Sequence, residues 1–332
     1  MVRAQIIATI GPASNDDEVI KDKIRAGADI IRINMSHTNV RGAADKIERI
    51  NNINHILNTD IPVMLDLKGP EIRIGEVKEN TMLKKGSELI VCTRMCVSDD
   101  TIISITPKES IHLFEVGDTL VVNDSTVVLE VTKAGDEAKV KVKKAGTLSS
   151  RKGIHIVDKT LDLPFLNEDD IKTLEFAGVA SVPYVALSFV NRASDVLEAK
   201  QIINNDKVKV YTKVETKDAI CNLEEIIDES DGIIVARGDL SITMPYHELG
   251  IITKKIVAAC KDQDKPVYLA TDVLQSMMTS PKPTKAEIAD ITHVISSGVT
   301  GCLLAGETAV GKYPVKSVAV LNDIMAIVER NE

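Results

Sequence analysis

The sequence contains no tryptophan, and aromatic residues make up only 3% of its 332 residues, although 44% of the chain is hydrophobic. Aliphatic side chains must therefore fill most of the core, which is typical of parallel strands that are buried on both faces. The five cysteines are scattered and lack the Cys and His spacing of a zinc site. We interpret them as reduced thiols of a cytoplasmic protein.

Long apolar runs and basic blocks are also absent. No hydrophobic stretch approaches the ~18 residues of a membrane-spanning helix, and the start of the chain does not resemble a signal peptide. The formal net charge is −9, with acidic and basic residues mixed along the chain. This pattern argues against nucleic acid as a partner. We therefore expect a cytoplasmic protein that binds neither membranes nor nucleic acid.

Two glycine-rich nucleotide motifs are missing. The chain has neither a G-x-x-x-x-G-K-[ST] loop nor a G-x-G-x-x-G motif after its first predicted strand. Any bound phosphate would consequently have to be held by Arg and Lys side chains.

Short aliphatic runs alternate with segments of helical period along most of the chain. Eight predicted strands, each followed by a predicted helix, lie at 5–11, 29–35, 62–68, 184–190, 209–215, 232–237, 266–270 and 301–306. Clear helices are predicted at 40–57, 217–229 and 246–262. The repeats span close to the ~250 residues of a (β/α)8 barrel. We predict an α/β fold with a TIM barrel at 1–70 and 158–332; a doubly wound open sheet is the alternative.

Residues 71–157 have a different pattern. Short alternating runs such as T-V-V-L-E-V and K-V-K-V replace the helical period, and turn signals at Lys85-Gly86 and Gly135-Asp136 separate them. This pattern predicts a small all-β domain inserted after the third barrel strand. We interpret most of its lysines as a solvent-exposed face, with Lys152 as the exception.

Charged residues stand at the ends of two neighbouring predicted strands. The strand 209–215 ends in Lys213 and Glu215, and the strand 232–237 leads into Arg237 and Asp239. In a parallel sheet the carboxyl ends of the strands form the ligand-binding edge. Two carboxylates there suit Mg2+ or Mn2+, and the cations beside them suit an anionic substrate. Surface salt bridges are the alternative interpretation.

Other predicted strand ends add polar residues to the same mouth. They are Arg32, Asn34, Ser36, Asp66, Lys68, Thr271, Asp272, Glu307 and Thr308. Cations around a hard metal are what phosphoryl transfer requires, because its catalysis rests mainly on positioning and on neutralising charge.

Six ordered blocks resemble the signature blocks of the pyruvate kinase family. They are A-T-I-G-P-A-S (8–14), R-I-N-M-S-H (32–37), L-D-L-K-G-P-E-I-R (65–73), T-K-V-E (212–215), S-D-G-I-I-V-A-R-G-D-L (230–240) and G-E-T-A-V-G-K-Y-P (306–314). The inserted β domain falls where that family has its lid. The resemblance implies the glycolytic reaction of phosphoenolpyruvate and ADP to pyruvate and ATP.

The resemblance also implies roles for individual residues. Lys213 resembles the lysine that stabilises the enolate and the phosphoryl group in transit, and Arg32 resembles the arginine that grips that group. Glu215 and Asp239 resemble the ligands of Mg2+ (or Mn2+). These residues would carry the chemistry, because the enolate leaving group develops negative charge that Lys213 and the metal would neutralise.

Further positions match the substrate and nucleotide contacts of the family. The backbone N–H groups of Gly238 and Asp239, with Thr271, resemble the cradle for the substrate carboxylate, and Thr271 also resembles part of a proton relay to the enolate. Arg73 resembles a nucleotide-phosphate contact, and Lys152 resembles its partner in the lid.

His37 follows the second block and is interpreted either as a nucleotide contact or as a hydrogen-bonding residue behind the site. A K+ site is implied as well. Its ligands would be Asn34, Ser36, Asp66 and the backbone of Leu67. Glu71 matches the K+-dependent form of the family, whereas Leu67 and Ile74 match the independent form, so K+ dependence stays open.

The chain departs from the family pattern at five positions, which are Leu67, Ser241, Asp272, Ala305 and Val310, where the family usually has Thr, Gly, Gln, Ser and Lys. Asp272 adds a negative charge beside the expected carboxylate cradle, and Val310 removes a cation near the nucleotide. These departures motivate two alternatives. One is a non-catalytic or regulatory paralogue that binds metal and a small phosphorylated or carboxylate ligand; the other is a barrel enzyme acting on the enolate of another 2-oxo acid.

The family usually continues past the last barrel helix into a further α/β domain that carries the allosteric site, and this sequence ends before that point. We therefore expect no activation by a sugar phosphate through such a domain. Barrel surfaces pair subunits in the family, which implies a homodimer or a larger homo-oligomer.

Overall fold

The computed structural model describes residues 3–122, 126–157, 159 and 163–331. The predicted return into the barrel at residue 158 lies outside them. The chain folds into two compact units. The first comprises Met1–Gly69, Leu166–Gly238 and His247–Glu332, and the second comprises Pro70–Phe165 and Asp239–Tyr246.

The first unit contains a parallel barrel. Within the described residues, eight strands close on one another because β1 pairs with both β2 and β17. In barrel order they are β1 (Gln5–Ile10), β2 (Ile30–Asn34), β3 (Val63–Asp66), β13 (Tyr184–Leu187), β14 (Lys209–Val214), β15 (Gly232–Ala236), β16 (Val267–Ala270) and β17 (Gly301–Leu304). The predicted (β/α)8 barrel is confirmed, and the open sheet is excluded.

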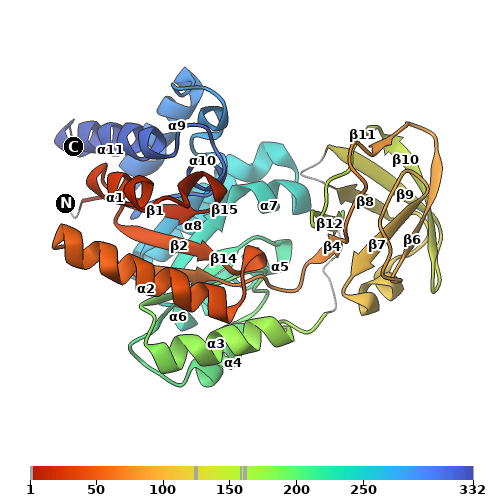
Figure 1. Cartoon of the computed structure of the whole chain (residues 1–332), viewed down its shortest axis with the longest axis horizontal. Coiled ribbons are helices and arrows are strands. Elements are labelled where there is room, and N and C mark those ends of the chain that lie inside the picture. The colour runs from red at the N-terminus through yellow and green to blue at the C-terminus, as the bar shows by residue number, and fades with distance from the viewer. Residues whose placement is uncertain (1–2, 123–125, 158, 160–162, 332) are drawn as a thin grey trace. The chain divides into compact units, whose positions relative to one another are not determined.

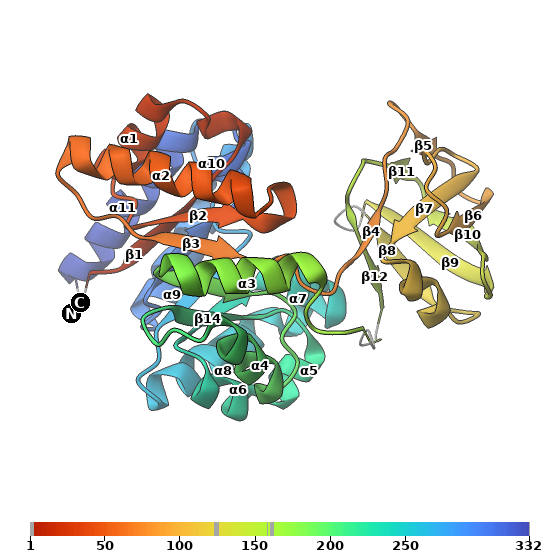
Figure 2. The same cartoon turned by 60° about the horizontal axis from the view of Figure 1, so that its bottom comes forward.

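Helices surround these strands in both views (Figures 1 and 2). The longer ones are α1 (Asp17–Arg25), α2 (Val40–Leu57), α3 (Glu168–Ala180), α4 (Ala193–Ile203), α8 (Leu249–Asp262), α9 (Lys285–Ser296) and α11 (Pro314–Asn331). The shorter ones are α5 (Lys217–Cys221), α6 (Leu223–Glu229), α7 (Arg237–Thr243) and α10 (Gly306–Ala309). Side-chain caps explain several starts: Asn39 accepts from Gly42 N before α2, and Thr284 forms a capping box with Glu287 before α9.

Two predicted helices differ from the structure. The predicted helix 217–229 is divided at Asn222, whose side-chain amide donates to Asn191 O at 2.8 Å while its backbone leaves the helical region. The predicted helix 246–262 begins as α8 at Leu249, and an additional helix, α7, starts at Arg237 directly after β15. Arg237 and Asp239 therefore lie in the first turn of a helix and not at the tip of a strand.

The barrel interior contains three of the five tyrosines of the chain. Tyr211 packs edge-to-face against Tyr184 and Tyr268, with ring centroids 5.4 Å and 5.7 Å apart. Every barrel strand contributes to this cluster, whose buried members are Ile7, Ile30, Met64, Ala186, Tyr211, Ile234, Tyr268, Ala270 and Leu303. Tyrosine rings thus fill the part of the interior that the aliphatic side chains leave open.

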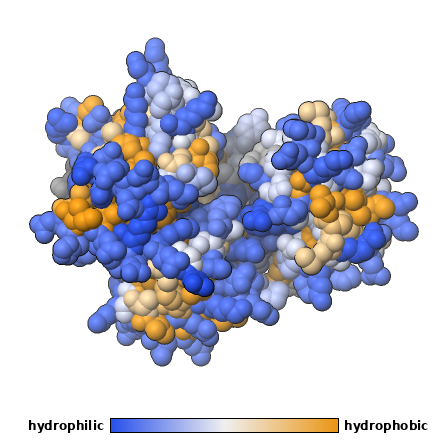
Figure 3. Space-filling model, viewed as in Figure 1, coloured by the Kyte–Doolittle hydropathy of each residue, from blue (hydrophilic) through white to orange (hydrophobic). Residues whose placement is uncertain are grey.

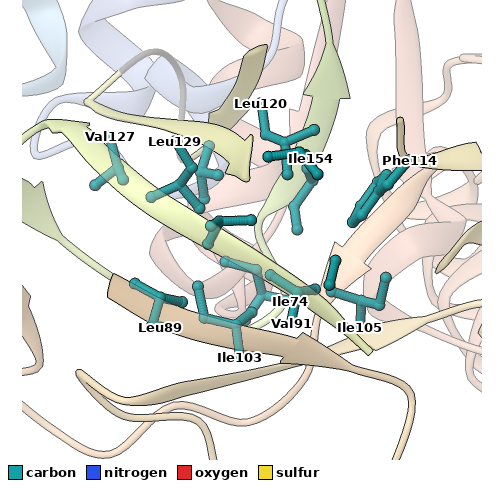
Figure 4. Packing of buried hydrophobic residues seen from close by; sticks show 14 of the residues in the cluster. Ile74, Leu89, Val91, Ile103, Ile105, Phe114, Leu120, Val127, Leu129 and Ile154 are labelled. Atoms are coloured by element: carbon teal, nitrogen blue, oxygen red, sulfur yellow. The ribbon is translucent and has the colours of Figure 1, made fainter. Parts of the chain in front are cut away.

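The second unit contains the predicted β domain. Seven strands of its described residues close into a smaller barrel: β4 (Ile72–Ile74), β6 (Glu88–Cys92), β7 (Ile102–Thr106), β8 (Thr119–Val122), β9 (Val127–Lys133), β10 (Ala138–Lys144) and β12 (Gly153–Ile156). A separate pair is formed by β5 (Met82–Leu83) and β11 (Gly146–Thr147). Aliphatic residues and Phe114 fill the core (Figure 4). Along β10 the valines are buried and the lysines exposed, as predicted from the alternating pattern.

Hydrophilic residues cover much of the molecular face drawn in Figure 3, with apolar residues in separate patches. Among the helices of the described chain, none combines the length and the apolar composition that crossing a membrane requires.

Candidate active site

A polar layer lies above the apolar interior of the barrel. Side chains two positions apart on a strand point to the same face. The inward-facing residues that follow Ile7, Ile30, Met64 and Tyr211 on their strands are Thr9, Arg32, Asp66 and Lys213. The strand alternation therefore builds a charged site on a packed hydrophobic floor, at the carboxyl ends of the strands.

Asp66 is the centre of this layer. Its side chain is buried, with 1% of the residue exposed. One carboxylate oxygen, Oδ2, accepts a hydrogen bond from Arg32 Nε at 2.5 Å, and the other, Oδ1, lies 3.2 Å from Lys213 Nζ. Burial alone would raise the pKa of Asp66, but the positive charges of Arg32 and Lys213 outweigh it and hold the pKa below its usual value. The carboxylate therefore stays ionised between two cations.

Lys213 is shared between two carboxylates. Its Nζ lies 3.0 Å from Glu215 Oε1, in addition to its contact with Asp66. Glu215 is 1% exposed, and its Oε2 accepts a hydrogen bond from Phe189 N at 2.7 Å. A buried, ionised pair of this kind is stable only when its hydrogen bonds are made. The arrangement fixes both the ammonium and the carboxylate at the barrel mouth.

Glu215 offers the kind of ligand that Mg2+ or Mn2+ prefers, a carboxylate held in place by neighbouring donors. Asp239, the other predicted ligand, is the third residue of α7 and belongs to the second compact unit. Its pairing with Glu215 stays a prediction. No three His, Cys, Asp or Glu side chains of the described residues form a metal-binding group. A two-carboxylate site would therefore complete its coordination with substrate oxygens and water.

Thr9 was not predicted as a site residue, yet it fixes Arg32. Arg32 Nη1 donates to Thr9 Oγ1 at 2.9 Å, and that hydroxyl donates to Leu304 O at 2.8 Å. The Thr9 backbone N–H donates to Thr308 Oγ1 at 2.9 Å. The guanidinium is thus held at Nε by Asp66 and at Nη1 by Thr9. The spacing of two residues from Ile7 was the sequence signal for this position.

Strain is concentrated next to Gly238. Thr271 and Asp272 have left-handed backbone angles, with φ of 63° and 51°, which residues with a Cβ rarely adopt. Gly238 N donates to Thr271 Oγ1 at 2.6 Å, and that hydroxyl donates to Ala270 O at 2.6 Å. A Cβ at Gly238 would stand 3.2 Å from Thr271 Oγ1. The structure therefore brings two of the predicted cradle residues together.

Arg237 is held by two partners within the barrel unit. Its Nη1 donates to Asp290 Oδ2 at 2.8 Å, and its Nη2 donates to Asp272 O at 2.7 Å. A carboxylate of α9 thus pairs with this guanidinium, and the expectation that it binds an anionic substrate stays a prediction. Arg237 also stabilises the strained turn through the Asp272 carbonyl.

The predicted K+ ligands all make hydrogen bonds in this structure. Asn34 Oδ1 accepts from Ser36 N at 2.9 Å, in the 3-10 turn η2 (Met35–His37). Leu67 O accepts from Ser188 Oγ at 2.6 Å. With Asp66 occupied by Arg32 and Lys213, a K+ ion would have to share these oxygens with their donors. The site stays a prediction.

Two predicted phosphate contacts lie together in the β domain. Arg73 of β4 pairs with Gly153 of β12, and Ile74 N donates to Lys152 O at 2.9 Å. Arg73 Nη1 donates to Arg151 O at 2.8 Å, and its guanidinium also forms an ion pair with Glu71. Antiparallel pairing of β4 and β12 therefore places Arg73 close to Lys152, the residue that precedes β12.

A cavity of about 500 Å³ opens beside the polar layer in the barrel unit. Arg32, Asn34 and His37, all predicted site residues, line it. Two cations that the sequence interpretation missed, Lys46 and Arg49 of α2, line it as well, and burial lowers the pKa of Lys46. Their spacing of three residues, which places both on one face of α2, was the available signal.

Comparisons with known proteins agree on one family. A family model described as pyruvate kinase, barrel domain, matches residues 1–318. A pyruvate kinase of Bacillus licheniformis is 36% identical over 98% of this chain and 57% of its own length, and one of Staphylococcus haemolyticus is 34% identical over 99% and 57%. A pyruvate kinase of Thermotoga maritima is 35% identical over 99% of the chain and 72% of its own length. The chain thus spans little more than half of the first two relatives.

Proposed function

The chain belongs to the pyruvate kinase barrel-domain family, and we propose that it transfers the phosphoryl group of phosphoenolpyruvate to ADP, giving pyruvate and ATP. One observation carries the proposal. The ammonium of Lys213 lies between two buried carboxylates, Asp66 and Glu215, beside a guanidinium that is fixed at two of its nitrogens. Such fixed cations are what a reaction needs when its transition state spreads negative charge.

The reaction breaks the bond between phosphorus and the enol oxygen and forms a bond from phosphorus to a β-phosphate oxygen of ADP. Asp66 and Thr9 each take one of the five N–H donors of Arg32. The remaining part of the guanidinium would grip a phosphoryl oxygen. Lys213 would stabilise the enolate oxygen as the bond breaks. Both cations are held before the substrate arrives, so little reorganisation accompanies the step.

Mg2+ or Mn2+, bound by Glu215 and Asp239, would supply Lewis-acid neutralisation of the phosphoryl and carboxylate oxygens. The chain itself would orient the substrate carboxylate with the N–H groups of Gly238 and Asp239. Gly238 N donates to Thr271 Oγ1 in this structure. The substrate carboxylate would therefore have to replace that hydroxyl as acceptor, and the released Thr271 hydroxyl would be placed to assist protonation of the enolate carbon.

The cavity beside Arg32 supports a nucleotide site. Its volume of about 500 Å³ and the cations His37 (when protonated), Lys46 and Arg49 suit an anionic ligand of nucleotide size. Arg73 and Lys152 are the proposed phosphate contacts of the β domain. The proposal also includes a K+ ion bound by Asn34, Ser36, Asp66 and Leu67. It further includes a cytoplasmic location and a homodimer or larger homo-oligomer.

A second candidate function is a paralogue that binds metal and a small anionic ligand without turnover. Val310, which stands where the family usually has Lys, lines the cavity with a side chain that is 56% exposed. An apolar side chain at this place would weaken phosphate binding. Failure of ADP to raise the melting temperature, while phosphoenolpyruvate raises it, would favour this candidate.

A coupled pyruvate assay with Mg2+, phosphoenolpyruvate and ADP, with and without K+, tests the main proposal. Lys213→Met should lower kcat by about 10²–10³-fold, since removal of a single charge-stabilising group costs this much in comparable sites. Lys209→Met is the matched control, because Lys209 lies on the same strand with an exposed side chain paired to Asp231. Equal activity of the two variants, or an inactive but folded wild type, would overturn the kinase reading.

A further inference from the structure

The first turn of α3 holds the chain where it leaves the barrel after β3. Asp170 is 1% exposed. Its Oδ1 accepts a hydrogen bond from Lys68 N at 3.0 Å, and its Oδ2 accepts from Gly69 N at 3.1 Å. These two backbone groups directly follow Asp66 and Leu67. One carboxylate thus binds two successive amides next to the centre of the candidate site.

Asn167 links the segment around Gly69, where the chain leaves the barrel, to the segment that returns to the barrel before α3. Its side-chain oxygen caps α3 by accepting from the N–H groups of Asp169 and Asp170, at 3.0 Å and 2.9 Å. Its amide nitrogen donates to Asp170 Oδ2 at 2.6 Å and lies 3.4 Å from Gly69 O. The outgoing segment at Gly69 and the returning segment at Asn167 are therefore tied together within the barrel unit. We call these contacts of Asp170 and Asn167 with Lys68 and Gly69 the clasp.

The outgoing segment also packs against Ser188 and Phe189, which follow β13. Gly69 has a φ of +72°, and a Cβ there would stand 2.9 Å from Ser188 and 3.0 Å from the Phe189 ring. Ser188 Oγ donates to Leu67 O at 2.6 Å and lies 3.3 Å from Asp66 Oδ1. Residues 66–69 are thus held both by the clasp and by residues that follow β13.

The clasp has an energetic cost. Burial raises the pKa of Asp170 to about 6, and its hydrogen bonds from Lys68, Gly69 and Asn167 only partly offset the desolvation. Helix capping does not require this carboxylate, because Asn167 supplies the cap. The Asp170 carboxylate is therefore buried at a cost in desolvation free energy and is not needed to cap the helix. This indicates that it serves to position the backbone amides that it binds.

We propose that Asp170 is a positioning residue, which fixes the backbone of Lys68 and Gly69 and thereby the carboxylate of Asp66 between Arg32 and Lys213. The catalytic part of this inference rests on the proposed function. The structural part does not, since it concerns backbone amides and distances that can be measured without turnover.

Asp170→Asn is the main test. A carboxamide has only one acceptor oxygen, so one of the two amides would face an NH2 donor in place of an oxygen. We expect hydrogen exchange at Lys68 or Gly69 to accelerate about tenfold or more, corresponding to loss of one hydrogen bond to a charged group. The crystal structure of the variant should show a longer Asp66–Lys213 or Asp66–Arg32 distance. In the assay, kcat should fall about tenfold with a smaller change in the KM for ADP.

Asp169→Asn is the matched control, because Asp169 occupies the same helical turn with an exposed side chain. Asn167→Ser serves if Asp170→Asn does not fold, since serine keeps a capping oxygen and removes only the amide donors. It should speed exchange at Gly69 by a smaller factor.

Unchanged amide exchange and unchanged Asp66 distances in Asp170→Asn would overturn the proposal. Faster exchange with wild-type kcat, in an active enzyme, would also overturn it and leave the clasp a purely structural feature. A wild type without kinase activity would refute the proposed function alone, because exchange and distances would still decide whether Asp170 positions Asp66.

Discussion

Lys213 Nζ lies 3.2 Å from Asp66 Oδ1 although their strands, β14 and β3, are separated in the barrel by β13. The contact is made across the interior and above the hydrophobic floor. Ser188, at the end of the intervening strand, is small enough to leave this space open and lies 3.3 Å from the same carboxylate oxygen. The curvature of the closed barrel therefore brings Lys213 and Asp66 into contact although their strands are not neighbours.

Asp66→Asn should be the most damaging conservative change in the site. It leaves Arg32 and Lys213 without the carboxylate that both contact, so about 3–5 kcal/mol of the free energy of unfolding should be lost. Urea unfolding measures this loss, and the pyruvate assay should show activity reduced by about 10³-fold. Asp22→Asn, at an exposed ion pair with Arg25, is the control and should change stability by less than about 1 kcal/mol. Equal destabilisation by the two variants would contradict this assignment.

Thr9→Val should loosen Arg32 while it preserves the shape of the side chain. Loss of a hydrogen bond to a charged group is worth about 1.5–3 kcal/mol, so kcat/KM for phosphoenolpyruvate should fall about 10–100-fold. Thr292→Val, on the exposed face of α9, should leave the kinetics unchanged. Steady-state kinetics of both variants give the answer. A Thr9→Val enzyme as fast as the wild type would show that Asp66 alone is sufficient to hold the guanidinium.

Lys23 gives a prediction about pH. This side chain is fully buried, donates to Thr9 O at 3.1 Å, and has its pKa lowered by burial from 10.5 to about 7. Between pH 7 and 10.5 the unfolded chain therefore binds a proton that the folded chain does not, so this lysine makes the free energy of unfolding rise with pH in that window. Each pKa unit corresponds to about 1.4 kcal/mol.

Lys23→Met should remove this contribution. The variant should gain stability relative to the wild type below pH 7, where the wild type buries the full charge, and the difference should shrink toward pH 10. Thermal unfolding at pH 6, 7, 8, 9 and 10 measures the trend. Lys21→Met, on the same helix at an ion pair with Glu18, is the control and should give a nearly constant difference. A constant difference for Lys23→Met as well would mean that the amine is charged in the folded protein throughout.

Val310→Lys should strengthen nucleotide binding. The added ammonium would enter the cavity that contains Arg32 and Lys46, at a position that is half-exposed, so the KM for ADP should fall by up to about tenfold. The KM for phosphoenolpyruvate should change little. Ile327→Lys, at a similarly exposed position of α11, controls for the added charge. An unchanged KM for ADP in Val310→Lys would place the nucleotide elsewhere.

The sequence predicted the barrel, its insertion and most of its charged mouth because the strand and helix periods are regular and the charges follow apolar runs. It missed α7 because Arg237-Gly238 after a strand indicates a turn, and the helix starts there without a loop. It missed Lys46 and Arg49 because polar residues on an amphipathic helix are normally solvent-exposed.

Asp170 escaped prediction for a similar reason. Three acidic residues begin α3, and acidic residues in a first turn are explained by the helix dipole alone. Only the three-dimensional structure distinguishes the one that turns inward to Lys68 and Gly69 from the two that are exposed. Long-range partners of this kind leave no local pattern.

The tyrosines of the barrel interior have a practical consequence for spectroscopy. Because the chain has no tryptophan, its intrinsic emission comes from tyrosine alone, and one of its five tyrosines, Tyr211, contacts the rings of both Tyr184 and Tyr268 beneath the polar layer. Fluorescence excited in the near ultraviolet is therefore a label-free reporter of barrel closure. It would register opening of the interior in every variant described above.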